Sequence, residues 1–167
     1  MLLFVVCVNC NNSHETVGKK QLFDLNWKFS YGESKFASEN DFSDHGWQNI
    51  DLPHDWSTEA DFSIQKPSAP GEIVGWYRKH FNIPENWIGK DVIIEFEGIG
   101  KGAEIFINGL QITESIGKSN SFQLNLKSYL NYEEENVIAI KVSQSQEEFE
   151  SRDIKNGIFN HVWLIVK

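Results

Sequence analysis

The sequence of 167 residues contains only two cysteines, Cys7 and Cys10, and both lie within its first ten residues. The rest of the chain has no thiol, so no disulfide can hold the folded domain together. A Cys-x-x-Cys pair can bind a metal or act in redox chemistry, but two thiols without further ligands are a weak signal for either role. We therefore expect no metal site and no cofactor.

The sequence also lacks a long hydrophobic run. The apolar segment at residues 1–8 is far shorter than the roughly 20 residues that a membrane-spanning helix needs. It resembles the end of a secretory signal, followed by a polar spacer. We predict that residues 1–20 are an export signal remnant and spacer, and that the protein is exported, either periplasmic or at the cell surface. A cysteine after such a run can be the lipid-attachment site of a bacterial lipoprotein, so lipidation of Cys7 or Cys10 stays open.

Positive charge is scarce in this chain. Its 15 Lys and Arg residues are outnumbered by 24 Asp and Glu residues, which gives a net charge of -9. Nucleic acids and anionic membranes attract basic surfaces, so neither is expected as a partner. The length suits one domain that can bury a core of its own.

Several catalytic motifs are missing as well. Gly-Lys-Ser occurs at 117–119, but the full phosphate-loop pattern is absent because Ile112 stands where its first glycine is required. The sequence also has no dinucleotide-binding glycine pattern after a strand, no Gly-x-Ser-x-Gly elbow and no His-Glu-x-x-His. The five histidines are scattered without metal-ligand spacing. His54 and Asp55 are adjacent, but neighbours on an extended chain point in opposite directions, so they do not form a base and its orienting carboxylate. Asp55 is interpreted as a residue that fixes a turn. The glutamate runs at 133–135 and 147–150 are interpreted as solvated charge.

Alternating hydrophobicity dominates what the sequence does contain. Short segments with a period of two recur between polar turns, including 21–31, 75–84, 121–126 and 157–166. Residues 137–142 are apolar except for Lys141, which is typical of a strand buried over most of both faces. Eight or nine such strands without a helical period predict an all-β fold, an antiparallel β-sandwich.

The stretch from residue 90 to residue 112 has the clearest pattern. Val92, Ile94 and Phe96 fall on one side of an extended chain, and a second alternating segment begins at Ala103. Asn-Gly at 108–109 tolerates positive φ, which a tight hairpin turn requires. We predict a β-meander here, with one buried and one exposed face.

The six tryptophans allow two interpretations. Aromatic side chains commonly fill β-cores, and this is the simpler explanation for each of them. Flat aromatic faces can also stack on the C–H-rich face of a sugar ring, which would place some of them in a binding site.

A series of segments resembles one known family in both content and order. They are Leu52–Ser57 (Leu-Pro-His-Asp-Trp-Ser), Gly75–Phe81 (Gly-Trp-Tyr-Arg-Lys-His-Phe), Phe96–Ile99, Ala103–Gly109, Asn136–Val142 and Gly157–Leu164. Together they are similar to the N-terminal sugar-binding domain of glycoside hydrolase family 2, and most similar to its β-galactosidase-like branch. The resemblance extends over about residues 22–167, and we assign residues 21–167 to one such domain.

The resemblance implies a jelly-roll sandwich of the galactose-binding-domain type. In the family this domain precedes an immunoglobulin-like domain and a (β/α)₈ barrel, and the barrel carries the two catalytic glutamates. The present sequence has no Asn-Glu dipeptide, which is the family's acid/base motif. We therefore expect an accessory domain that ends before the barrel, has no catalytic residue of its own and binds a β-galactoside-type glycan.

The resemblance also suggests where a sugar would be contacted. In relatives the loop before the Gly-Ile-Phe segment reaches toward the barrel and helps to shape the sugar pocket. Here that loop contains Arg152 and Asp153, so these two residues are candidates, together with Asp55 and Trp56 on the Pro-His-Asp-Trp segment. An arginine can grip carboxylate or hydroxyl groups with its planar fork. Alternatively, Arg152 pairs with Asp153 or Glu150 on the surface.

Two other functions remain open from the sequence. The domain could be an independent carbohydrate-binding module, or an adhesion domain without a sugar site.

Overall fold

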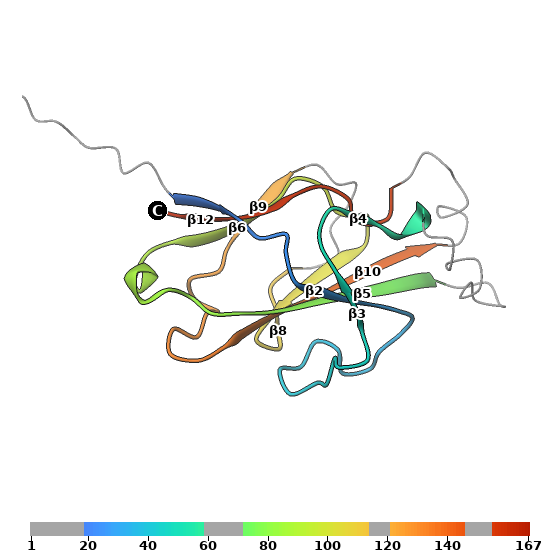
Figure 1. Ribbon diagram of the computed structural model, residues 1–167, viewed down its shortest axis with the longest axis horizontal. Helices are drawn as coiled ribbons and strands as arrows, with labels where there is room; N and C mark the ends of the chain where they lie inside the picture. Colours follow the sequence, from blue (N-terminus) through green and yellow to red (C-terminus); the bar gives the residue numbers. More distant parts are fainter. Residues whose placement is uncertain (1–18, 59–71, 114–120, 146–154) are drawn as a thin grey trace, which may run out of the picture.

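The computed structural model describes residues 19–58, 72–113, 121–145 and 155–167. Within these ranges the protein is all-β and antiparallel, with two short 3₁₀ turns, η1 (Trp56–Thr58) and η2 (Glu85–Trp87), and no α-helix. The predicted β-sandwich is confirmed. Figure 1 shows one sheet, with β12, β6 and β9, lying across a larger sheet that contains β2, β5 and β10.

The smaller sheet has four strands in the order β1 (Lys19–Leu22), β12 (Val162–Val166), β6 (Val92–Phe96) and β9 (Phe122–Asn125). The larger has six, in the order β3 (Gln48–Ile50), β2 (Trp27–Tyr31), β5 (Glu72–Phe81), β10 (Asn136–Ser145), β7 (Ala103–Ile107) and β8 (Leu110–Gln111). A two-stranded bridge joins β4 (His54–Asp55) to β11 (Gly157–Ile158).

Alternation sets which side chains enter the core between the sheets. On β6, Val92, Ile94 and Phe96 are fully buried, while Ile93 and Glu95 between them are partly exposed. The same pattern occurs on β7 and β12. Because successive side chains of a strand point to opposite faces, one apolar face per strand is enough to fill the space between the layers.

Strands β5 and β10 differ because they are buried on both faces. They pair over ten residues, from Asn136 opposite Phe81 to Ser145 opposite Glu72. A second, smaller cluster covers their outer side, where Ala37, Val74, Trp76 and Ala139 pack with Phe42, Trp47 and Phe106. The apolar run at 137–142 is thus explained, as predicted.

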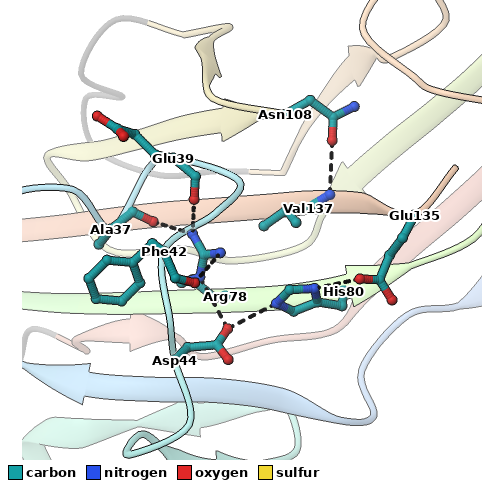
Figure 2. Close-up of polar contacts among 9 residues, drawn as sticks. All are labelled: Ala37, Glu39, Phe42, Asp44, Arg78, His80, Asn108, Glu135 and Val137. Atoms are coloured by element: carbon teal, nitrogen blue, oxygen red, sulfur yellow. Dashed lines mark hydrogen bonds and ion pairs between the residues drawn. The ribbon is translucent and has the colours of Figure 1, made fainter.

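The outer cluster depends on a segment of residues 32–47 that crosses the larger sheet, and Arg78 of β5 holds this segment in place. Arg78 is fully buried and donates to the Asp44 carboxylate at 3.1 Å. It also donates to the carbonyl oxygens of Ala37, Glu39 and Phe42, at 2.5, 3.0 and 3.4 Å (Figure 2). Its guanidinium charge is therefore surrounded by four oxygen acceptors.

Asp44 is shared between Arg78 and His80. His80, two residues along β5, places Nε2 at 3.1 Å from the same Asp44 carboxylate, and its Nδ1 lies 2.9 Å from Glu135 (Figure 2). Burial alone raises the pKa of Asp44, but the hydrogen bonds and charges of Arg78 and His80 outweigh it and leave that pKa below its ordinary value. Asp44 therefore stays ionised at neutral pH.

Three strand predictions require correction. The segment 90–112 is not a meander, because β6 pairs with β12 and β9 whereas β7 pairs with β10 and β8. The connection between β6 and β7 crosses from one sheet to the other. The alternation of buried and partly exposed residues on β6 and β7 is confirmed, and so is the hairpin at Asn108-Gly109, with positive φ at both residues.

The other two corrections concern single strands that are in fact two. Residues 21–31 split into the end of β1 and β2, which belong to opposite sheets, and Asn26 adopts a positive φ of 62° in the connection. Residues 157–166 split into β11 and β12. A break of three or four residues leaves the alternation of apolar residues on each side intact, so the pattern alone did not show it.

Substitution of Arg78 by Met tests the role of this buried cation. The variant leaves Asp44 and three backbone carbonyls without their donor, so we expect it to lose about 3–5 kcal/mol of unfolding free energy. Urea denaturation measures the loss. Lys141→Met is the matched control, because it removes a surface ion pair with Glu33 that is worth about 0–1 kcal/mol. Equal losses in the two variants would contradict the assignment.

Candidate functional site

The described part of the sequence-predicted site lies at the two-stranded bridge between β4 and β11. Gly157 pairs with Asp55 and Ile158 with His54. The backbone nitrogen of Trp56 donates to the carbonyl oxygen of Asn156 at 3.2 Å. The bridge thus brings the Pro-His-Asp-Trp segment against the residues that directly follow Arg152 and Asp153 in sequence. Arg152 and Asp153 themselves lie outside the described residues.

Asp55 organises the turn at this bridge. One carboxylate oxygen accepts hydrogen bonds from the Ser57 hydroxyl at 2.6 Å and from the backbone nitrogens of Ser57 and Asn156, each at 3.1 Å. Asx-type bonds of this kind fix a turn without help from the sheet. The geometry agrees with the interpretation of Asp55 as a turn-fixing carboxylate. Its assignment to a substrate site stays a prediction.

The rim of this candidate site is the β4–β11 bridge with its described flanking residues, 54–58 and 155–158, and the Trp56 side chain lies in the core beneath it. This side chain is fully buried, stacks on Tyr31 with ring centroids 5.5 Å apart, and meets Phe29 edge-on at 5.6 Å. This packing corresponds to the core interpretation of the tryptophans, which also holds for Trp27, Trp76 and Trp87. A direct contact of Trp56 with sugar stays a prediction, and its burial favours support of the rim from below.

Three further residues, His54, Tyr77 and Gly157, contribute to this bridge, and the sequence analysis did not select them as site residues. His54 is buried and its Nδ1 lies 2.8 Å from the Tyr77 hydroxyl. Gly157 has a φ of 96°, and a Cβ at this position would overlap the Tyr77 hydroxyl and the His54 carbonyl oxygen. Only glycine fits there, because positive φ and the close approach both exclude a side chain. The histidine next to Asp55 and the glycine before Ile158 were the available sequence signals.

His54 and Asp55 confirm the argument against a catalytic pair. The His54 ring faces Tyr77 in the core, whereas the Asp55 carboxylate faces Ser57 and Asn156. In the part of the chain that the structure describes, no group of three or more His, Cys, Asp or Glu side chains could hold a metal ion. The described residues also include no helix long and apolar enough to cross a membrane.

The other predictions from single residues concern glutamates and histidines. Glu133, Glu134 and Glu135 are exposed, as expected for solvated charge.

His161 is one of the five scattered histidines, and it contacts a buried carboxylate. Its Nδ1 lies 2.6 Å from the carboxylate of Asp24. That hydrogen bond raises the pKa of His161 above its ordinary value, because it favours the protonated ring.

A β-sandwich with a loop-built rim is the architecture of many carbohydrate-binding domains, and the motifs here belong to one of them. The family model for the sugar binding domain of glycosyl hydrolases family 2 matches residues 21–167, and the chain belongs to this family. The match extends over nearly all of the chain after its first 20 residues.

Curated relatives are glycosidases of more than one specificity. The chain is 37% identical over 147 residues to beta-galactosidase BoGH2A of Bacteroides ovatus, an alignment that covers 85% of this chain and 17% of that protein. It is 32% identical over 130 residues to a beta-glucuronidase of Formosa agariphila, with 74% of this chain and 13% of that protein covered. The chain therefore spans between about an eighth and a sixth of the length of these relatives.

Solved structures show the same fold. A glycosyl hydrolase family 2 member from Bacteroides cellulosilyticus superposes with a TM-score of 0.77 at 29% identity, covering 89% of this chain and 20% of that one. A beta-glycosidase from Bacteroides vulgatus superposes with a TM-score of 0.73 at 32% identity and the same coverage of both chains. Both likenesses are to part of a much longer protein.

Substitution of Asp55 by Ala tests its role in holding the bridge together. Three hydrogen bonds are lost, so we expect a loss of about 1–3 kcal/mol in unfolding free energy. The amides of Ser57 and Asn156 should also exchange with deuterium faster. Asp41→Ala, at an exposed position of the 32–47 segment, is the control and should change neither quantity. Unchanged exchange at both amides in Asp55→Ala would refute this role.

Proposed function

We propose that this chain is the accessory sugar-binding domain of a family 2 glycosidase that acts on β-galactosides. The identity of 37% to beta-galactosidase BoGH2A carries the proposal for the sugar. In this proposal the domain has no catalytic residue of its own. The catalytic glutamates belong to a barrel that works together with this domain and with an immunoglobulin-like domain, as the family resemblance implies.

The rim around β4 and β11 is the part of the domain that we assign to sugar contact. The bridge makes a rigid base, because Asp55 fixes the turn and Trp56 fills the space below it. Loops on a rigid scaffold commonly carry binding residues. Arg152 and Asp153 are the proposed contacts, since a guanidinium and a carboxylate together can bind several sugar hydroxyls.

A glucuronide is the second candidate ligand, because a curated relative at 32% identity is a beta-glucuronidase. The two sugars differ in charge, since a glucuronide carries a carboxylate and a galactoside does not. An arginine binds a carboxylate through two parallel charge-assisted hydrogen bonds, so a role for Arg152 would be larger with the glucuronide.

NMR titration of the labelled domain with methyl β-galactoside and methyl β-glucuronide tests the proposal. We expect millimolar binding of the galactoside, with amide shifts concentrated at residues 54–58 and 155–158, and no hydrolysis of nitrophenyl-β-galactoside. Arg152→Ala should abolish these shifts, and Lys141→Ala on the outer face of the larger sheet should not. Shifts elsewhere in the domain would reject this rim, and turnover at glycosidase rates would reject a non-catalytic domain.

We also propose that the protein is exported, on the basis of the apolar and then polar residues 1–20. Expression of a tagged chain in a Gram-negative host, followed by fractionation, should find it in the periplasm or the membrane fraction. If it is a lipoprotein, Cys7→Ser or Cys10→Ser should abolish incorporation of labelled palmitate. Recovery of unprocessed protein in the cytoplasm would refute export.

A further inference from the structure

A cavity of about 280 Å³ opens at an edge of the sandwich, away from the β4–β11 bridge. Most of its walls are apolar, and they include Leu22 and Leu25 from the β1–β2 region, Phe81 at the end of β5, and Trp87 of η2. Leu22 and Leu25 are both largely exposed at its border. The cavity therefore offers a small molecule an apolar environment with direct access from solvent.

One cationic side chain, Lys79, lies among these walls. Tyr77, Lys79 and Phe81 alternate along the inner face of β5, so Lys79 points between the sheets where the other two residues are core side chains. It is 8% exposed. Its Nζ lies above the ring of Phe23, 4.3 Å from the centroid, and 5.7 Å from that of Trp27.

The amine of Lys79 has more hydrogen-bond donors than it uses among the described residues. Among the described residues it donates one hydrogen bond, to the carbonyl oxygen of Leu25. A lysine ammonium has three donors. Its outer-face neighbour Arg78, in contrast, bonds four oxygens. The side chains that line the cavity thus include a buried lysine whose amine has one hydrogen-bond acceptor among the described residues.

Burial changes the protonation of this amine. Desolvation lowers the pKa of Lys79, and the nearby carboxylates of Asp24 and Asp51 oppose the shift without cancelling it. Asp24 in turn is bound by His161. The neutral amine, which is the nucleophilic form, is therefore more abundant at Lys79 than on an ordinary lysine at the same pH.

We propose that Lys79 is a nucleophilic amine and that this cavity binds small aldehydes with an apolar body, which Lys79 captures as an imine. An apolar body matches the leucine and aromatic walls. A carboxylate ligand is disfavoured, because Asp24 and Asp51 already place negative charge beside the amine. The proposal concerns a second site and does not depend on sugar binding at the rim.

The reaction needs no redox partner. The Nζ lone pair attacks the carbonyl carbon, a C–N bond forms, and the carbonyl oxygen takes up a proton to give a carbinolamine. Loss of that hydroxyl as water, with loss of the proton from nitrogen, leaves the imine. Amine and aldehyde thus give imine and one water, and hydrolysis returns both reactants.

The test uses butanal with sodium cyanoborohydride, which reduces each imine to a stable secondary amine. Mass spectrometry of peptides then gives the rate of labelling at every lysine of the intact chain. We expect Lys79 to be labelled faster than the exposed Lys35 and Lys90 at pH 7, and its advantage to shrink as the pH rises toward 9. A rate at Lys79 equal to or below those two would overturn the proposal.

Two variants and a second aldehyde distinguish labelling that depends on the cavity from the general reactivity of lysines with aldehydes. Lys79→Arg keeps a cation beside Leu25 but cannot form an imine, so the fast labelling should be lost, whereas Lys90→Arg should retain it. The rate comparison within the native protein stands even if Lys79→Arg folds poorly. Glyceraldehyde, which is polar, should show less preference for Lys79 than butanal does. Equal preference for the two aldehydes would reject the apolar cavity as the binding site.

Discussion

The coordination of the Arg78 guanidinium is the interaction on which the larger sheet depends. A buried charge is costly unless hydrogen bonds replace the water that it loses. Arg78 meets this requirement with one carboxylate and three backbone carbonyls, all from residues 37–44. Those same bonds satisfy carbonyl groups of a segment that forms no strand. The cation and the segment therefore stabilise each other.

The hydrogen bonds between Arg78 and residues 37–44 determine how the outer faces of β5 and β10 are buried. With residues 32–47 held across the sheet, Ala37 and Phe42 cover Trp76, Val74 and Ala139, so β5 and β10 are buried on both faces. Most positions of their ten-residue pairing are buried. The bridge of β4 and β11 is attached to this sheet, since the Tyr77 hydroxyl of β5 lies within hydrogen-bonding distance of the His54 ring of β4. Strand β5 thus contacts the bridge through Tyr77 on its inner face and residues 37–44 through Arg78 on its outer face.

Much of this fold could be predicted from local pattern, but the pairing of strands could not. Alternation correctly assigned inner faces on β6 and β7, because a period of two is a property of each strand alone. Two consecutive strands show the same alternation whether they pair within one sheet or lie in two facing sheets. That is why residues 90–112 were wrongly predicted as a meander. The breaks in residues 21–31 and 157–166 were missed for a related reason, since short connections do not disturb the alternation.

The candidate site was predictable to a similar degree. Motif resemblance selected Asp55 and Trp56, and the structure places both at one bridge. It did not select Tyr77 or Gly157, which reach that bridge through contacts between residues far apart in sequence. The covering of the larger sheet by residues 32–47 could not be predicted, for the same reason. Nothing in their composition shows that a buried arginine on a distant strand binds their carbonyl groups.

Adjacent cations on β5 show how the two faces of one strand can serve different chemistry. Arg78 points outward into a shell of matched oxygens, and a guanidinium stays protonated in any such environment. Lys79 points inward to aromatic rings and, among the described residues, donates only to the Leu25 carbonyl, and burial lowers its pKa there. Exchange of the two residue types would therefore be harmful at both positions. A lysine could not bond four acceptors with three donors, and an arginine in the cavity would remain charged and could not act as a nucleophile.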